Sequence, residues 1–305
     1  MSAPRVSVVV VSYNTNDKLR RCLSCIETHH EVIVVDNASG DGSADMVALD
    51  FPHVTLIRSD RNLGFGPANN LGCTKAHGDA VLFLNSDAYA EPGAIDKLAS
   101  VLDHPDVVAV GGRLLNPDGS LQGSTANELT LWSVFCEQTL LEKAFPSSRI
   151  FSPYWTTLRS GDREDPWQTP QLMGASLMVR AKDGRPMEEF DPRYFLYCED
   201  TDLCKRLSVL GRLLYVPTAR FTHDLGSSSG RDPAMGVIRY NRGKELYFRI
   251  HHGAFASAIC LLLDRGGALL RLLGWTLIAA AKLGRDQRAN GQVKSFWRVL
   301  TALRP

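Results

Sequence analysis

Residues 81–88 have the sequence VLFLNSDA, in which an apolar run stops abruptly. Four apolar residues in a row predict a short buried β-strand. That strand would end at Asn85, Ser86 and Asp87, where polar side chains are common both in ligand sites and in plain turns. Three interpretations stay open at this point: a metal and phosphate site, a turn, or a degenerate two-aspartate motif.

Short apolar segments of the same kind alternate with helical patterns through the first third of the chain. Alternating strands and helices predict a parallel sheet that is covered by helices on both faces. The expected strands are 6–11, 31–35, 54–58 and 81–84, and the expected helices are 18–27, 43–49 and 67–76. The fold class is therefore α/β.

The later part of the chain continues this pattern less regularly. We expect a helix at 92–102, a strand at 107–111, a turn at 116–119, a strand at 172–179, a helix at 199–210 and a strand at 212–216. Residues 124–170 contain tryptophans separated by polar residues and prolines. We interpret them as a variable insertion within one domain.

Composition and charge exclude some classes of function. The net charge of the 305-residue chain is +1, so overall electrostatics does not favour nucleic acid as a partner. The seven cysteines are irregularly spaced, and Cys22 and Cys25 have no second pair at zinc-ligand spacing. They are expected to be reduced structural thiols, which suits a cytoplasmic protein.

Residues 254–285 are strongly apolar but are interrupted by charges at Asp264, Arg265 and Arg271 and by two glycines. A membrane-spanning helix needs about 20 mostly apolar residues, which these interruptions make improbable. We expect a pair of amphipathic helices at a membrane surface, with a helical pair packed on the protein's own core as the alternative. The nearby basic residues are Lys282, Arg285, Arg288, Lys294 and Arg298.

Three polar clusters follow the expected strands of the first third. They are Ser12-Tyr13-Asn14, Asp36-Asn37 and Asn85-Ser86-Asp87. Ligands of parallel α/β sheets bind outside the carboxyl ends of the strands. The clusters are therefore expected to meet at one edge of the sheet and to form a binding site there.

The segment from Gly64 to Asn69 contains two of the three glycines of a dinucleotide-binding fingerprint. That fingerprint needs a third glycine and lies after the first strand of its unit. Here Asn69 stands at the third position and the first strand ends at Ser12 instead. A nicotinamide or flavin site is therefore not expected.

A second group of candidate residues lies near position 200. Glu199, Asp200 and Asp202 crowd at a helix start after the aromatic stretch RYFLYC. A carboxylate beside other carboxylates and apolar rings has a raised pKa, as a general base requires. His223 ends another apolar strand and is a candidate metal ligand together with Asp87.

The order of these motifs resembles family 2 glycosyltransferases with the GT-A fold, especially their bacterial rhamnosyltransferase-like branch. The matching pieces lie within residues 5–230 and are VSVVVVSYN, EVIVVDNASGDGS, RNLGFGPANNLG, LFLNSDA, GASLMVR, FDPRYFLYCEDTDLCKR and HDLGSSSG. The resemblance implies a mostly parallel Rossmann-like sheet followed by C-terminal amphipathic helices. We expect a catalytic domain at 1–250, with a nucleotide-binding half at about 1–115 and an acceptor half at about 116–250. A helical, membrane-associating segment is expected at 251–305.

The resemblance also implies roles for individual residues. The residues matching nucleotide-sugar-binding positions are Ser12, Tyr13, Asn14, Asp36, Asn37, Arg61, Asn62, Gly64, Asn69, Asn85, Ser86 and Asp87. Asp200 matches the general base, and Glu199 is expected to orient hydroxyl groups. Asp87 and His223 match metal ligands. Asn85 replaces the first acid of the family's metal motif, so its contact with ribose or phosphate instead of metal stays open.

The expected reaction is transfer of a sugar with inversion at its anomeric carbon. A divalent cation, Mg²⁺ or Mn²⁺, would stabilise the departing diphosphate. The preferred donor is dTDP-L-rhamnose, and the acceptor is a hydroxyl of a lipid-linked or cell-surface glycan. The enzyme would lie in the cytoplasm at the inner face of the plasma membrane, which residues 254–298 would contact. The alternatives are a UDP-sugar donor, a related sugar nucleotidyltransferase or an inactive glycan-binding homologue.

Overall fold

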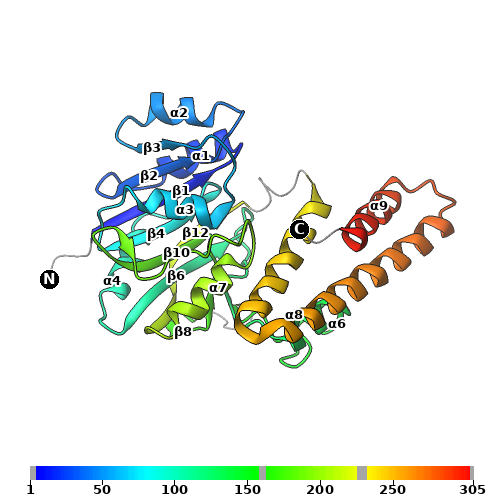
Figure 1. The fold of residues 1–305 in the computed structure, drawn as a ribbon. Helices are drawn as coiled ribbons and strands as arrows, with labels where there is room; N and C mark the ends of the chain where they lie inside the picture. The colour runs from blue at the N-terminus through cyan, green and yellow to red at the C-terminus, as the bar shows by residue number, and fades with distance from the viewer. Residues whose placement is uncertain (1–4, 158–162, 225–231, 303–305) are drawn as a thin grey trace. The chain divides into compact units, whose positions relative to one another are not determined.

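The computed structural model describes residues 5–157, 163–224 and 232–302 (Figure 1). The chain forms two compact units. The sheet unit consists of Met1–Glu128 and Trp155–Ser228, and the helical unit of Leu129–Tyr154 and Ser229–Pro305. The predicted boundary at residue 250 differs from this division, because it falls inside a helix of the helical unit.

The sheet unit is built on one mixed sheet, which has ten strands among the described residues. Its order is β3-β2-β1-β4-β10-β6-β12-β5, with β11 beside β10 and β8 beside β12. The first four strands pair in parallel and are β1 (Val6–Ser12), β2 (Glu31–Asp36), β3 (Thr55–Arg58) and β4 (Ala80–Asn85). This confirms the expected α/β fold with a mostly parallel sheet.

Alternate residues of the strands face two separate apolar cores, one on each side of the sheet. In β1, Val8 and Val10 pack into one core and Val9 into the other, because successive side chains point to opposite faces. The first core is covered by α1 (Asn16–Ser24), α2 (Ser43–Asp50) and α4 (Ala94–Leu102), and the second by α3 (Phe65–Cys73) and α7 (Glu199–Leu207). Burial on both faces explains why these strands are continuously apolar.

The second half of the sheet is more extensive than the sequence indicated. β6 (Val107–Leu115) and β12 (Arg212–His223) pair in parallel, and β12 runs past the expected end at residue 216. Its register shifts between Val216 and Arg220, where Pro217 cannot donate to the ladder. β12 then pairs with β5 (Ala88–Ala90), so His223 lies opposite Ala88. This extension carries His223 to the same part of the sheet as Asp87.

Residues 124–170 do not behave as one insertion. Their ends remain in the sheet unit as β7 (Thr125–Ala126) and β8 (Trp167–Gln168), and β9 (Gln171–Leu172) follows directly. The middle forms α5 (Leu131–Gln138) and α6 (Leu141–Ala144), which belong to the helical unit. There Leu129 and Val134 share a core with Tyr247, Phe248 and Cys260. The remaining strands of the described residues are β10 (Ser176–Lys182) and the short β11 (Arg185–Pro186).

The helical unit is dominated by α8 (Pro233–Ala281) and α9 (Gln287–Thr301). α8 is interrupted at Gly253, whose φ of 86° is left-handed. Gly266 and Gly267 interrupt the apolar run of the sequence but not the helix, since residues 254–281 are continuous in α8. Gly267 is instead a packing position, because a β-carbon there would collide with the side chain of Gln138.

Gly253 divides α8 into two arms, 233–252 and 254–281, and a buried ion pair joins them. The ammonium of Lys244 is fully buried and lies 2.7 Å from Oδ1 of Asp264 and 3.1 Å from Oε2 of Glu137 in α5. Gln138 Nε2 also donates to Asp264, at 2.9 Å. A cavity of about 240 Å³ beside this pair is lined by Glu137, Gln138, Asp264 and Arg271 among others. The network therefore fastens α5 to both arms of the kinked helix.

Lys244→Met is expected to destabilise the helical unit by about 3–5 kcal/mol, because it leaves the Asp264 carboxylate buried without its counter-ion. Thermal unfolding and limited proteolysis of the full chain would measure the loss. Lys205→Met is the matched control, since Lys205 and Glu128 form an exposed pair worth about 1 kcal/mol or less. Equal effects of the two substitutions would contradict a structural role for the buried pair.

Candidate functional site

The three polar clusters that follow β1, β2 and β4 lie at one edge of the sheet. In the parallel registers, Ser12 is opposite Asp36 and Val11 is opposite Asn85. The strand ends are thus aligned within about one residue, or roughly 3 Å. The side chains of the three clusters accordingly share a common edge, where a ligand of an α/β sheet binds.

Asp36 and Asn37 organise the loops that follow β1 and β2 at this edge. Asp36 Oδ2 accepts from Ser39 N–H at 3.1 Å, while its buried Oδ1 has no hydrogen-bond partner among the residues that the structure describes. Asn37 donates from Nδ2 to the carbonyl of Gly64 and to Asn62 Oδ1, at 2.9 and 3.0 Å. Asn37 therefore holds the 61–64 loop in place, and the orphaned oxygen of Asp36 is available to a ligand.

The remaining residues of this group occupy different environments. Ser12 is buried and bonds the Thr15 hydroxyl at 2.9 Å, and Thr15 donates to Ser86 at 2.9 Å. Asn14 accepts from Gly40 N–H at 2.7 Å, which ties the first loop to the second. Tyr13 and Arg61 are exposed. Asn69 is fully buried within α3 and donates to the carbonyl of Phe65 at 3.0 Å, so its side chain stabilises that helix.

The glycine loop packs tightly against the segment that precedes the acidic pair. Gly64 has a φ of 88°, and a β-carbon on it would overlap the carbonyl of Phe195. Phe65 N–H donates to that same carbonyl at 2.8 Å. A β-carbon on Gly66 would lie 2.8 Å from Cβ of Phe190. The glycines thus permit the 64–66 loop to approach the 190–195 segment closely. In a dinucleotide fingerprint, by contrast, the glycines permit close contact with a phosphate.

Asp87 and His223 lie together, held by a residue that the sequence did not single out. His223 Nε2 is 3.3 Å from Asp87 Oδ1 and 3.2 Å from Asn85 Nδ2. On the other side of the ring, His223 Nδ1 lies 2.7 Å from Gln122 Oε1, an acceptor. Nδ1 therefore carries the proton and Nε2 presents its lone pair toward Asp87. A divalent cation fits this donor set, because its cis ligands are about 3 Å apart.

Glu199 and Asp200 start α7 in contrasting surroundings. Asp200 is half-buried and accepts from Gly174 N–H at 2.9 Å and from Thr201 N–H at 2.8 Å. Glu199 is buried, and its Oε2 has no hydrogen-bond partner. Backbone donors favour an ionised carboxylate, whereas burial without donors favours the acid form.

The two acids accordingly differ in protonation. Burial, and then the charge of the Asp200 carboxylate, raise the pKa of Glu199 to about 8. Burial also raises the pKa of Asp200, while hydrogen bonds from Gly174 and Thr201 oppose the increase. The arrangement keeps Glu199 protonated near neutral pH, whereas the two backbone donors favour the ionised form of Asp200, whose raised pKa makes it more basic than an exposed aspartate.

Backbone strain marks the entrance to α7. Tyr197 and Cys198 both have left-handed φ values, of 74° and 66°, which cost energy in residues other than glycine. The neighbouring segment is anchored to α3, since Asn70 exchanges hydrogen bonds of 2.8 and 3.0 Å with the backbone of Phe190. These hydrogen bonds hold the strained backbone in place. The strained backbone in turn sets the orientation of Glu199 and Asp200 at the start of α7.

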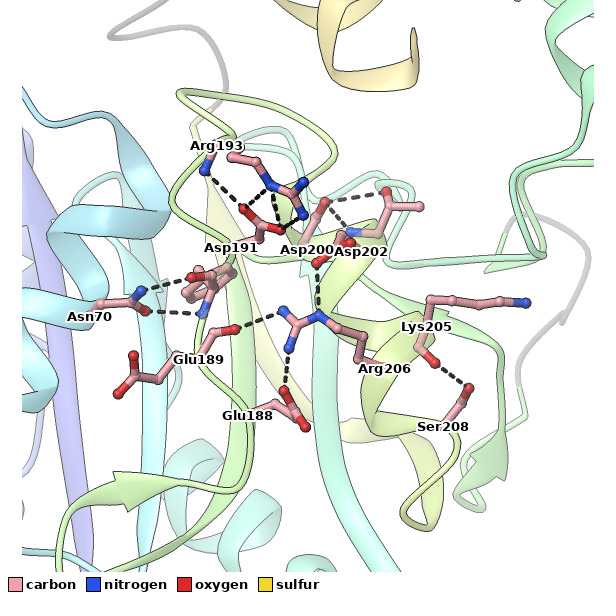
Figure 2. A network of polar contacts seen from close by, with 12 residues as sticks. Asn70, Glu188, Glu189, Asp191, Arg193, Asp200, Asp202, Lys205, Arg206 and Ser208 are labelled. Carbon is pink, nitrogen blue, oxygen red and sulfur yellow. Dashed lines mark hydrogen bonds and ion pairs between the residues drawn. The ribbon is translucent and has the colours of Figure 1, made fainter. Parts of the chain in front are cut away.

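Asp202 does not join this pair. It is fully buried and accepts from Arg206 Nε at 2.9 Å, and Arg206 also bonds Glu188 and, at 2.7 Å, the carbonyl of Glu189 (Figure 2). Asp202 therefore has a structural role, in which it fixes α7 to the preceding segment through Arg206.

Two positioning residues escaped the sequence analysis. Gln122 follows a predicted turn and is indistinguishable there from an ordinary exposed glutamine. Gly174 begins the apolar stretch GASLMVR, and a glycine at such a place can signal a close backbone approach. A β-carbon on Gly174 would lie 3.3 Å from Cβ of Asp200, which is the approach that such a glycine predicts.

Comparison with known proteins supports a common ancestry. Residues 7–164 match the family model described as glycosyl transferase family 2. The chain is 31% identical over 300 residues to an N-acetylglucosaminyl-diphospho-decaprenol L-rhamnosyltransferase of Mycobacterium tuberculosis, which covers 92% of this chain and 95% of that protein. It is 26% identical to the rhamnosyltransferase WbbL of Escherichia coli over 236 residues, with 72% and 83% covered.

Solved structures resemble the chain in fold. A mannosyltransferase from Pyrobaculum calidifontis, in complex with GDP-Man and Mn²⁺, matches with a TM-score of 0.57 at 16% identity, over 98% of this chain and 86% of that one. GalNAc-T7 with UDP, GalNAc and Mn²⁺ matches with a TM-score of 0.54 at 16% identity, over 80% and 48%. At this identity the likeness concerns the fold alone.

Glu199→Gln is expected to stabilise the protein increasingly as the pH rises from about 4.5 to 8. In that window the folded chain retains the Glu199 proton that the unfolded chain has lost, so the free energy of unfolding falls with pH. Glutamine does not ionise and avoids this loss, which amounts to a few kcal/mol at most. Thermal unfolding at several pH values would test this, with exposed Glu128→Gln as control. A pH-independent difference would contradict the raised pKa.

Proposed function

The chain belongs to glycosyl transferase family 2, and on that premise we propose that it is an inverting hexosyltransferase. It transfers a sugar from a nucleotide donor to a hydroxyl of a lipid-linked or cell-surface glycan. The main support for this proposal is a pair of consecutive hydrogen bonds at the sheet edge, both donated by backbone N–H groups. Asn85 N–H donates to the carbonyl of Ala175 at 3.2 Å, and the adjacent Gly174 N–H donates to Asp200. The candidate base is thereby tied to the donor-binding edge.

The proposed donor site uses the loops around the ends of β1, β2 and β4. The unpaired, buried Oδ1 of Asp36 suits a donor group on the nucleotide base or ribose. The proposed nucleotide-sugar contacts are Ser12, Tyr13, Asn14, Asp36, Asn37, Arg61, Asn62, Gly64, Asn85, Ser86 and Asp87. Asn69, which was predicted with them, is fully buried in α3 and is left out of the proposed contacts. One relative is named an L-rhamnosyltransferase and another a rhamnosyltransferase, which favours dTDP-L-rhamnose over a UDP-sugar.

Asp87 and His223 would hold a divalent cation, Mg²⁺ or Mn²⁺, which when bound neutralises charge on the donor's diphosphate. Gln122 fixes the ring of His223 so that Nε2 faces the site. Asn85 adds an amide beside Nε2, where it contributes no charge. The chain therefore supplies few ligands of its own, which suits a site where phosphate oxygens complete the coordination.

Asp200 is the proposed general base. The acceptor hydroxyl loses its proton to the Asp200 carboxylate while its oxygen forms a bond to the anomeric carbon. The bond from that carbon to the phosphate oxygen breaks, and its electron pair leaves with the nucleoside diphosphate. Attack from the side opposite the leaving group inverts the anomeric centre. Protonated Glu199 would donate a hydrogen bond to a sugar or acceptor hydroxyl.

Asp200→Asn is expected to lower the rate of transfer by about 10²–10⁴-fold and to leave nucleotide binding nearly unchanged, since the amide keeps the shape but accepts no proton. Transfer would be measured with a panel of nucleotide sugars, with and without a chelator. Thermal shift with dTDP, UDP and GDP would report binding. Asp191→Asn, an acid paired with Arg193 in the same segment, is the control. Transfer at the wild-type rate by the Asp200 variant would refute the assigned base.

The helical unit is the proposed contact with the inner face of the plasma membrane. α8 is long and apolar enough to cross a membrane by length and composition alone, and 28% of its most apolar window is buried in the protein. Its charged Asp264, Arg265 and Arg271 favour a surface position instead. Large exposed apolar residues recur along the second arm at intervals of four and seven, as on one helix face, and include Phe255, Leu262, Leu269, Leu273 and Leu277.

The triple variant Leu262→Gln, Leu273→Gln, Leu277→Gln is expected to weaken binding to anionic lipid vesicles by about tenfold or more, because each side chain loses its burial in lipid. Vesicle co-sedimentation would measure this. The double variant Leu49→Gln, Val209→Gln removes exposed apolar side chains from the sheet unit and should bind as the wild type does. Undiminished binding of the triple variant would argue against this face.

A further inference from the structure

A cluster of metal-binding side chains lies at the other end of β2 from Asp36. His29 and His30 immediately precede β2, and Asp96 lies in the first turn of α4. Because β2 is six residues long, the cluster is about 20 Å from the candidate donor site. It therefore shares no ligand with Asp87 or His223.

The donor atoms of the cluster converge. Asp96 Oδ1 lies 3.2 Å from His29 Nε2 and 3.6 Å from His30 Nε2. Glu27 Oε2 lies 3.9 Å from the same His30 nitrogen. Zinc bonds nitrogen and oxygen at about 2.0–2.1 Å in a tetrahedral site, which places its ligand atoms about 3.3–3.4 Å apart. The separations here bracket that value.

Hydrogen bonding within the protein does not account for these groups. The side chain of His30 is 3% exposed, and its Nε2 forms no hydrogen bond with any residue that the structure describes. Glu27 accepts from Gly93 N–H through Oε1, at 2.7 Å, yet its buried Oε2 accepts no hydrogen bond from the described part of the chain. Unsatisfied buried polar atoms are rare and require an explanation, of which a bound ion is one. Here two such atoms belong to one cluster.

Charge points in the same direction. Two carboxylates and two neutral imidazoles carry a net charge of −2, which a divalent ion neutralises. His29 and Asp96 are more than half exposed, so an ion has access from solvent. Mixed imidazole and carboxylate ligands suit zinc and similar transition metals better than magnesium or calcium, which prefer oxygen alone.

We propose that His29, His30 and Asp96 form a second metal site, for zinc or a similar divalent transition metal, with the Glu27 carboxylate beside His30 adding negative charge. The site ties the segment before β2 to the first turn of α4, and its role is structural. It is independent of the proposed transfer reaction, since none of its ligands is assigned to the donor, the acceptor or the catalytic cation.

Zinc binding to the tag-free, full-length Asp87→Ala, His223→Ala variant isolates this site from the catalytic cation. Equilibrium dialysis against micromolar Zn²⁺, followed by elemental analysis, should find one bound zinc that disappears after Asp96→Asn or His29→Ala. Each of these exposed substitutions is expected to weaken binding by about tenfold or more. Co²⁺ in the same protein should give the visible absorption of a tetrahedral site and lose it in both variants.

His104→Ala, an exposed histidine outside the cluster, is the matched control and should leave the bound zinc in place. Thermal unfolding with and without Zn²⁺ adds a second readout, in which the metal should stabilise the control but not Asp96→Asn. The proposal fails if no zinc binds at micromolar concentration. It also fails if the Asp96 and His29 variants retain as much zinc as the control.

Discussion

The antiparallel pairing of β10 with β4 is the constraint on which the arrangement of the candidate site depends. β4 delivers Asn85 to the donor edge, and β10 begins beside it, with Ser176 opposite Leu84. The two residues before this pairing then bond in opposite directions, Ala175 to Asn85 and Gly174 to Asp200. Because a strand ladder is rigid, the position of the carboxylate relative to the donor loops is set by the sheet, with little dependence on the surrounding loops.

Much of the sheet was predictable because the apolar pattern of each strand indicates whether its two faces are buried. Continuous apolar runs such as VSVVVV occur where both faces are covered, and each run ends where polar residues begin. The helical unit was less predictable. Gly266 and Gly267 suggested a break, but helix propensity is a weak influence that packing overrides, and Gly267 admits Gln138 instead. The actual interruption at Gly253 carries no stronger local signal than these two.

The candidate residues at the strand ends were foreseeable because parallel strands bring their carboxyl ends together. The groups that orient them were not. Gln122 bonds His223 across 101 positions of sequence, and such a partner becomes visible only when the fold is known. The separate duties of Glu199, Asp200 and Asp202 also required the structure. Adjacent carboxylates look equivalent in sequence, but their hydrogen bonds differ in the structure. Asp200 accepts from two backbone N–H groups, Asp202 accepts from Arg206, and Glu199 Oε2 accepts no hydrogen bond from a described residue.

The helical unit is assembled from two separated parts of the chain, and this bears on how the protein can change during evolution. Leu129–Tyr154 and Ser229–Pro305 share one core and the Lys244 network. Neither part can be exchanged by a single crossover, because the incoming segment would meet a partner that it did not evolve with. Recombination within the family would preserve the C-terminal helices only together with the distant segment that covers them. We therefore expect the two segments of the helical unit to be inherited together.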